Sequence, residues 1–288
     1  MSRLLAALPL LVLLNVASAS DNRRWSLDVD INGTVIVVDG EKNVVRQYTP
    51  ELVPTKEIGG AGWSDDQFDR PAGIWARNGI DVLIADYGNH RIQRFDRQLS
   101  FISSFSTRDR DNPEERFGYP TDVALSRLGD LFICDSENAR ILKVSGLSKV
   151  ERTFGGLGAG KGRLYRPQQI EVGPSDNVYV QDGKRIVVFD AFGNYLLTIE
   201  GLFASEPLIY ADERGLVALA DTRFFVFDRD DRPIASVEVD TSKVRSSPEA
   251  FALGRGVVYI LTQDGILTLP DPRAGGESNG LHERSRVR

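Results

Sequence analysis

Six short apolar runs that each end in an aspartate recur along this chain of 288 residues. The runs include VLIAD and LFICD, and the six aspartates are Asp39, Asp86, Asp135, Asp182, Asp221 and Asp264. Successive aspartates are 47, 49, 47, 39 and 43 residues apart. A period in the forties built from strands is typical of a β-propeller, in which each small sheet buries its faces only against neighbouring sheets. The repeat therefore predicts an all-β fold with six blades.

A proline stands upstream of five of the six aspartates and marks the start of each repeat. The separations are 14 to 16 residues, and the prolines are Pro71, Pro120, Pro167, Pro207 and Pro248. The first repeat lacks the proline, but Leu27, Val29 and Ile31 still alternate with polar residues as a half-buried strand should. We expect one closed propeller domain at residues 20–269.

The N-terminus has the pattern of a secretory signal peptide. An apolar run, LLAALPLLVLL, follows Arg3, and Ala17-Ser18-Ala19 gives the small-residue cleavage pattern. Because the run is too short for an ordinary spanning helix, we expect residues 1–19 to be removed and no membrane segment to remain. The sequence thus predicts an exported protein, periplasmic or extracellular, with a flexible tail at residues 270–288.

The net charge and the single cysteine each exclude one property. The formal net charge is −6, which makes nucleic acid an unfavourable partner for the whole surface. Cys134 is the single cysteine and excludes an intramolecular disulfide. Since Cys134 lies in the apolar run LFICD, we expect a buried and inert thiol.

Residues 67–96, QFDRPAGIWARNGIDVLIADYGNHRIQRFD, resemble an NHL repeat almost throughout. The third and fourth repeats resemble it through FGYPTDVALSRLGDLFICDSENARILKV and LYRPQQIEVGPSDNVYVQDGKRIVVFD. The resemblance implies a six-bladed propeller of NHL type. It does not imply one activity, because such propellers include binding platforms and a few enzymes.

A polar triplet repeats at the same hairpin turn in two blades. Asp86, Asn89 and Arg91 recur as Asp135, Asn138 and Arg140. The triplet suggests either a catalytic or metal-binding cluster, or a local hydrogen-bond network. We expect the network, because a repeated aspartate can accept turn amides and pair with arginine in every blade.

The chain also resembles the zinc-dependent amidating lyase that acts on peptidyl-hydroxyglycine. In that enzyme the zinc histidines follow the blade prolines directly, whereas the positions here are Ala72, Thr121, Gln168, Leu208 and Glu249. The chain has only two histidines, His90 and His282. A zinc site of that kind is therefore disfavoured, while oxygen ligands would suit calcium.

One face of the propeller is expected to carry the binding residues. In this topology the linker into each inner strand and the turn after each repeated aspartate emerge together, which gathers Trp63, Tyr87, His90, Tyr119, Tyr165 and Arg166. Aromatic and arginine side chains are effective binding anchors. An alternative is that Phe117, Tyr119 and Tyr165 fill gaps between blades. Asp122 and Gln169 would line the central channel, as ligand-binding groups or as a merely solvated lining.

Two functions follow from these residues. The leading hypothesis is a binding or scaffolding module for a protein, peptide or glycan, with no catalytic residue. The alternative is a calcium-dependent hydrolase or lyase with its site at the central channel. The residues assign no metal-ligand set, and no cofactor other than calcium is suggested. Ring closure is also open, since the sixth blade either takes residues 20–25 as a fourth strand or has three strands.

Overall fold

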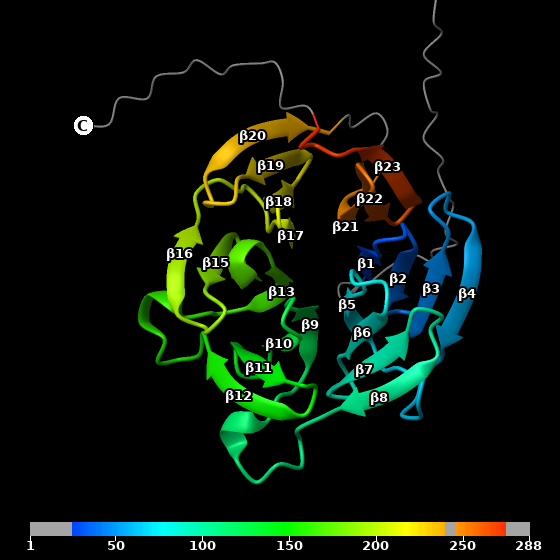
Figure 1. The fold of residues 1–288 in the computed structure, drawn as a ribbon, viewed down its shortest axis with the longest axis vertical. Coiled ribbons are helices and arrows are strands. Elements are labelled where there is room, and N and C mark those ends of the chain that lie inside the picture. The colour runs from blue at the N-terminus through cyan, green and yellow to red at the C-terminus, as the bar shows by residue number, and fades with distance from the viewer. Residues whose placement is uncertain (1–24, 240–245, 275–288) are drawn as a thin grey trace, which may run out of the picture.

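The computed structural model describes residues 25–239 and 246–274, and within these ranges six antiparallel sheets are arranged in a ring (Figure 1). The predicted all-β, six-bladed propeller is confirmed. The predicted signal peptide at residues 1–19 and the tail beyond residue 274 lie outside the described residues. No helix in the described ranges is long and apolar enough to cross a membrane.

Each blade is a meander in which the first strand lies innermost. The strands of the first three blades are β1 (Trp25–Val29), β2 (Val35–Asp39), β3 (Val44–Tyr48), β4 (Pro54–Gly59); β5 (Pro71–Trp75), β6 (Asp81–Asp86), β7 (Arg91–Asp96), β8 (Phe101–Phe105); β9 (Pro120–Leu125), β10 (Asp130–Asp135), β11 (Arg140–Ser145) and β12 (Lys149–Phe154). The other strands are β13 (Pro167–Val172), β14 (Val178–Asp182), β15 (Arg185–Phe189), β16 (Tyr195–Ile199); β17 (Leu208–Asp212), β18 (Gly215–Ala220), β19 (Arg223–Phe227), β20 (Pro233–Glu238); β21 (Pro248–Gly254), β22 (Val257–Thr262) and β23 (Gly265–Pro270). Three short 3-10 turns, η1 (Pro113–Glu115), η2 (Gly160–Gly162) and η3 (Pro174–Asp176), lie in the connections.

Strand register explains the constant spacing between proline and aspartate. Pro71 pairs with Asp86, Pro120 with Asp135, and Pro167 with Asp182 across the two inner strands of their blades. Each inner strand therefore begins where the second strand ends. We call the side of the ring that bears these ends the Asp face, and the sequence located it correctly.

The repeated aspartates act as hubs for local hydrogen bonds. Asp86 is fully buried and accepts from the amide of Asp69 at 2.8 Å, from Asn89 Nδ2 at 2.9 Å and from Arg91 Nε at 2.8 Å. The same contacts hold Asp135 in the third blade. The structural interpretation of the triplet is confirmed, whereas Asp221 in the fifth blade is exposed.

Packing between blades supplies the core. The apolar faces form four buried clusters, and the one around Phe132, Phe154 and Phe189 joins the third and fourth blades. Gly73 allows β5 to approach β9, because a Cβ there would lie 2.6 Å from Asp122 Cα. Cys134 is free and buried, as expected.

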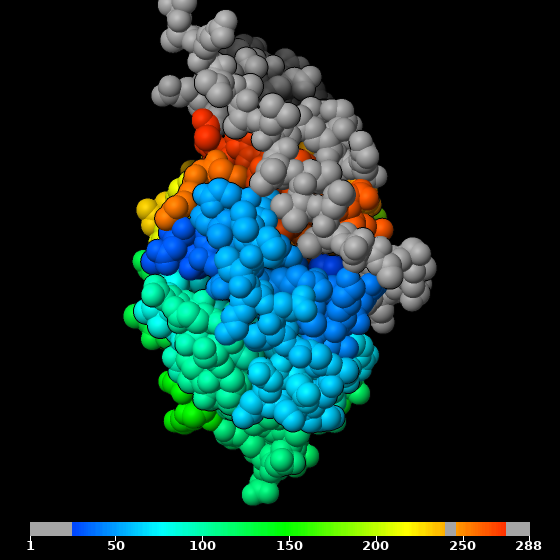
Figure 2. All heavy atoms as spheres, turned by 90° about the vertical axis from the view of Figure 1, so that its right-hand side faces the viewer, coloured from blue at the N-terminus to red at the C-terminus, as the bar shows by residue number. Residues whose placement is uncertain are grey.

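The first and sixth blades meet directly although they are far apart in the sequence (Figure 2). Trp25, Leu27 and Val29 share a buried cluster with Phe251 and other residues of the sixth blade. The described part of the sixth blade has three strands, β21 to β23. Trp25 pairs with Asp39 in the first blade, so it does not add to the sixth, and residues 20–24 lie outside the described ranges.

Two details differ from the sequence interpretation. Ile31 follows β1 and lies in the turn with 68% exposure, so the predicted strand alternation ends at Val29. At the other end of the chain, β23 continues to Pro270, and the Asp271 amide donates to Gly256 O at 2.9 Å. Arg273 binds Asp212 at 2.8 Å, which fixes the chain beyond the predicted domain boundary.

Candidate functional site at the channel mouth and the Asp face

A β-bulge follows the proline in four of the six inner strands. The register between the inner two strands shifts at Ala72, at Thr121 and Asp122, at Gln168 and at Glu249. A bulge adds an unpaired residue to one strand and re-aims its side chain, and bulges are frequent beside active sites. Here the added residues point toward the entrance of the channel.

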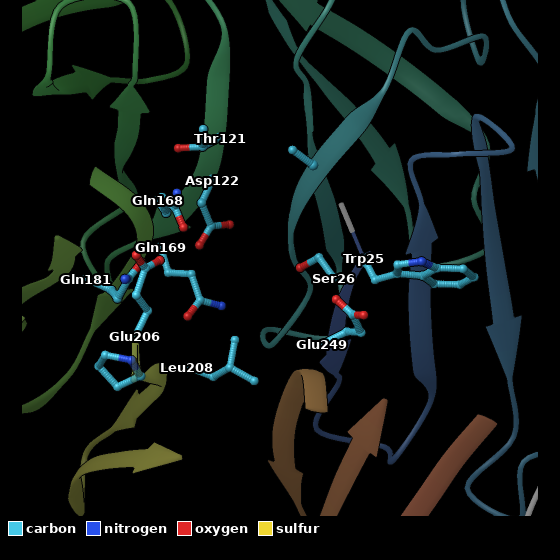
Figure 3. A pocket seen from close by; sticks show the side chains of 12 residues that line it. Trp25, Ser26, Thr121, Asp122, Gln168, Gln169, Gln181, Glu206, Leu208 and Glu249 are labelled. Carbon is cyan, nitrogen blue, oxygen red and sulfur yellow. The ribbon is translucent and has the colours of Figure 1, made fainter. Parts of the chain in front are cut away.

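The entrance is a cavity of about 240 Å³ on the Asp face (Figure 3). Five blades contribute the residue that follows the blade proline, and the first blade contributes the residue at the equivalent position: Trp25, Ala72, Thr121, Gln168, Leu208 and Glu249. Asp122, Gln169, Gln181 and Glu206 complete most of the polar lining. The positions at which the resemblance placed zinc histidines do meet at one site, but their side chains are different.

Asp122 and Gln169 line this cavity and also join neighbouring blades. Asp122 Oδ2 accepts from the amide of Ile170 in β13 at 3.0 Å, and Oδ1 accepts from Val123 at 2.9 Å. Gln169 Oε1 accepts from the amide of Ile209 in β17 at 3.0 Å. Both predicted residues therefore have a structural role at the channel, and neither contact tests a role in binding.

Arg77 closes the far end of the channel. Its guanidinium donates to Asp28 Oδ1 at 3.1 Å, to Glu171 Oε1 at 2.7 Å and to Ala211 O at 2.6 Å. It also lies 4.1 Å from the ring centroid of Tyr210, within cation–π range. One side chain from the second blade thus contacts the first, fourth and fifth blades.

The acids of the channel are hard to ionise. Burial raises the pKa of Asp122 well above its usual range, and the charge of Glu171 adds to the effect. Burial also raises the pKa of Glu171 to about 7, although Arg77 opposes the shift. Perturbed carboxyl groups in a cavity are frequent at functional sites.

An aromatic cluster lies on the Asp face between the second and third blades. Tyr119 is flanked by Tyr87, with ring centroids 5.1 Å apart, and by His90, at 4.3 Å. His90 Nδ1 accepts the Tyr119 amide at 3.1 Å, and burial together with Arg108 lowers the pKa of His90. Arg70 lies 5.2 Å from the Tyr87 ring centroid. We call Arg70, Tyr87, His90 and Tyr119 the Tyr–His cluster.

The other predicted face residues lie apart from this cluster. Trp63 is 68% exposed, and among the described residues no ring contact joins it to the cluster. Tyr165 is 65% exposed beside Arg163 and Arg185, while Arg166 forms an ion pair with Glu206 at the rim of the cavity. Phe117 is fully buried against Phe105, so the gap-filling alternative holds for Phe117 and does not describe the exposed Tyr165.

Sequence reasoning missed Arg77, Glu206 and Arg70. Of these, Arg70 precedes Pro71 just as Tyr119 precedes Pro120, and that shared position was a usable signal. Within residues 25–239 and 246–274, no group of three or more His, Cys, Asp or Glu side chains is arranged to hold a metal ion.

Comparison with known proteins agrees with this geometry. Residues 117–144 match the family model for the NHL repeat. The chain is 27% identical over 144 residues to the protein brain tumor of Drosophila melanogaster. It is 29% identical over 132 residues to a probable peptidyl-alpha-hydroxyglycine alpha-amidating lyase of Caenorhabditis elegans. These matches cover 49% and 44% of this chain, but only 13% and 33% of the length of the two relatives.

Solved structures share the fold at low sequence identity. Streptogramin B lyase has a TM-score of 0.60 and 16% identity, over 84% of this chain and 77% of its own. A gluconolactonase from Xanthomonas campestris has a TM-score of 0.62 and 12% identity, over 86% of each chain. Identities this low show the fold alone.

Six sheets around a polar channel, with repeated hubs at one face, define the class of six-bladed β-propellers. The family match in the third blade and the same Asp–Asn–Arg network in the second identify this chain as an NHL-repeat propeller.

Proposed function

We propose that the protein is an exported binding or scaffolding module that recognises a protein, peptide or glycan on its Asp face. The observation that carries the proposal is the Tyr–His cluster. Tyrosine and arginine side chains provide large contact area at low conformational cost and are enriched among binding hot spots. Sugar rings and peptide side chains can both stack on such a surface.

Backbone strain in the cluster supports this proposal. Arg70, His90 and Tyr119 have φ values of 51°, 51° and 50°, in the left-handed region. For residues with a side chain this conformation costs about 1–3 kcal/mol, and such strain gathers at functional sites. Arg70 and Tyr119 also precede prolines, where extended backbone is usual. The φ of His90 belongs to the repeated turn, since Ala139 at the same point of the third blade has a φ of 47°. The strain at Arg70 and Tyr119, which lie on one surface, favours a binding role.

A double variant, Tyr87→Ala with Tyr119→Ala, tests the surface. We expect it to lose capture of ligands on a glycan array and on a displayed peptide library, while its melting temperature stays near the wild-type value. Phe192→Ala is the matched control, because Phe192 is 67% exposed and lies in the β15–β16 turn, at the opposite end of its blade. Unchanged capture by the double variant would refute the assignment.

A triple variant extends the test to the rest of the predicted face. Trp63→Ala, Tyr87→Ala and Arg166→Ala together should abolish capture if these residues form one binding surface. Tyr165→Ala alone should weaken capture less, because Tyr165 lies beside Arg163 and Arg185, away from the cluster.

Export is a separate part of the proposal. It rests on the apolar run at residues 4–14 and the small residues that follow. N-terminal sequencing of the protein recovered from outside the cytoplasm should give Ser20 as the first residue. Recovery of the uncleaved chain in the cytoplasm would contradict export.

A calcium-dependent hydrolase or lyase at the channel is the second candidate. Two buried acids with raised pKa values beside a cavity favour it, since a protonated carboxyl can act as a general acid near neutral pH. The similarity to a probable amidating lyase also supports it. Turnover of lactone, ester or amide substrates that requires calcium and is lost in Glu249→Gln would favour this candidate over the binding module.

A further inference from the structure

His90 is the only histidine among residues 25–239 and 246–274, and its ring holds the backbone of the next blade. Its Nδ1 accepts the amide of Tyr119 at 3.1 Å, so Nδ1 carries no proton in this arrangement. The hydrogen bond joins the turn between β6 and β7 to the segment that enters β9. One titratable group therefore links the second and third blades within the Tyr–His cluster.

The turn that carries His90 does not require an imidazole. Ala139 occupies the same point of the third blade and has a φ of 47°, close to the 51° of His90. The His90 amide donates to Tyr87 O at 3.3 Å, and His90 O accepts from Ser106 Oγ at 3.0 Å, so these contacts use only the backbone of His90. The side chain instead directs its hydrogen bond and a ring contact to Tyr119.

Tyr119 keeps a strained conformation that depends on its neighbours. Its φ is 50°, and Pro120 follows it. Its carbonyl accepts from Ser136 Oγ at 2.6 Å, and its ring centroid lies 4.3 Å from that of His90 and 5.1 Å from that of Tyr87. Strained backbone persists only while the surrounding contacts fix it. Loss of the hydrogen bond to His90 would therefore allow the backbone of Tyr119 to relax.

Protonation of His90 is incompatible with this contact. A neutral imidazole with its proton on Nε2 offers Nδ1 as an acceptor, whereas an imidazolium donates from both nitrogens. The Nδ1 proton would then point at the N–H of Tyr119, which places two donors face to face. The hydrogen bond is lost, and the His90 ring has to turn away from Tyr119.

The surroundings of His90 keep it neutral near neutral pH. The titratable groups around the imidazole are Asp69, Arg70, Tyr87, Arg108, Tyr119 and Glu137. Two ion pairs, Arg108 with Glu137 at 2.9 Å and Arg70 with Asp69 at 3.2 Å, balance most of the charge. Burial has the largest effect and lowers the pKa of His90 from its ordinary value of 6.5, and the charge of Arg108 adds to this. Acidification therefore protonates His90.

We propose that His90 is a pH switch for the Asp face: its protonation breaks the contact with Tyr119, disassembles the Tyr–His cluster and releases a bound partner. The inference rests on the proposed function, since it concerns the regulation of the same surface. Binding favours the neutral imidazole, so the affinity is full above the pKa of His90 and falls below it. Stability has the same sign, because the unfolded state takes up the proton more readily and the folded state loses stability as the pH falls below 6.5.

Nuclear magnetic resonance tests the switch without a partner. At pH 8 the imidazole nitrogens of His90 should show the tautomer with the proton on Nε2, and the Tyr119 amide resonance should shift along the titration curve of His90 as the pH falls to 5. His90→Asn is the matched variant, because its Oδ1 replaces Nδ1 as an acceptor on Cγ, does not titrate and tolerates the left-handed φ. In His90→Asn the Tyr119 amide should show no such transition.

Capture on the glycan array and the displayed peptide library measures the effect on the binding face. It is compared at pH 8 and at the pH at which the titration shows His90 to be protonated. The wild type should capture ligands at least about fivefold more weakly at the lower pH, the effect of one lost hydrogen bond. His282→Gln, which removes the other histidine of the chain, should keep this ratio. In His90→Asn the ratio should be close to one at any absolute level of capture.

The outcomes separate this inference from the proposed function. A Tyr119 amide that does not follow the titration of His90 overturns the switch. Equal capture by the wild type at the two pH values, or the wild-type ratio in His90→Asn, also overturns it. If no ligand is captured at either pH, the proposed function is refuted, while the resonance titration still decides if His90 controls the conformation of Tyr119.

Discussion

Arg77 is predicted to hold the ring of blades together, and its removal should be among the most destabilising single changes. The perturbation is Arg77→Met, which keeps an apolar stem and removes the guanidinium. Its side chain is 19% exposed and joins Asp28, Glu171 and Ala211 O, so the variant leaves buried acceptors and an uncompensated charge.

The magnitude follows from these contacts. Breaking a buried ion pair by removing one partner costs about 3–5 kcal/mol. For a chain of this size each kcal/mol lowers the melting temperature by about 2–4 °C, so we expect a loss of at least about 6 °C. The loss should be larger at pH 8 than at pH 6, because Glu171 is ionised at the higher pH.

Urea and thermal denaturation of Arg77→Met at both pH values provide the assay. Arg94→Met is the matched control, since Arg94 pairs with Asp81 on the surface and such pairs contribute about 0–1 kcal/mol. A second variant, Arg77→Met with Glu171→Gln, should recover part of the stability by removing the stranded charge. If Arg77→Met lowered the free energy of unfolding by less than about 1 kcal/mol, Arg77 would not hold the ring of blades together.

Three further changes have expected outcomes. The pKa of Glu171 is about 7 in the folded protein and 4.5 for the ordinary group, so the folded state binds a proton that the unfolded state releases. Glu171 should therefore add about 1 kcal/mol to the free energy of unfolding as the pH falls from 8 to 6. The same pH dependence in Glu171→Gln as in the wild type would contradict this. Asp86→Ala should cost about 3–5 kcal/mol in urea denaturation because it strands buried donors. Asp221→Asn at the exposed equivalent position should stay within about 0.5 kcal/mol, because asparagine tolerates the left-handed φ of 54° at this residue. Gly73→Ala should lower the free energy of unfolding by about 1–3 kcal/mol, since the alanine Cβ would lie 2.3 Å from Asp122 Oδ1. A melting temperature equal to that of the wild type would show that β5 and β9 can move apart to accommodate the methyl group.

The sequence predicted the features that depend on residues close together in the chain. Proline and aspartate recur because they pair across one hairpin, so their spacing located the blades, the Asp face and the residues that meet at the channel mouth. The burial of Phe117 and the exposure of Tyr165 were not separable by this means, since both are aromatic residues just before an inner strand. Their packing depends on the neighbouring blade.

Contacts that cross the channel could not be predicted. Arg77 and Glu171 are 94 residues apart, and their meeting depends on the radius and closure of the ring. Arg77 also lies in an ordinary turn sequence, ARNGID, that fits a solvent-exposed arginine equally well. The pattern within one repeat carries no information about a contact with a residue two blades away.

The bulges after the blade prolines let one strand both pair with its neighbour and line the channel mouth, with different residues for each role. Ala72, Gln168 and Glu249 have no partner on the second strand, while the residues before and after each of them are paired. A substitution there changes the lining of the mouth while the paired positions keep their contacts. One ring can therefore present methyl, amide and carboxylate side chains at its entrance, each from a different blade.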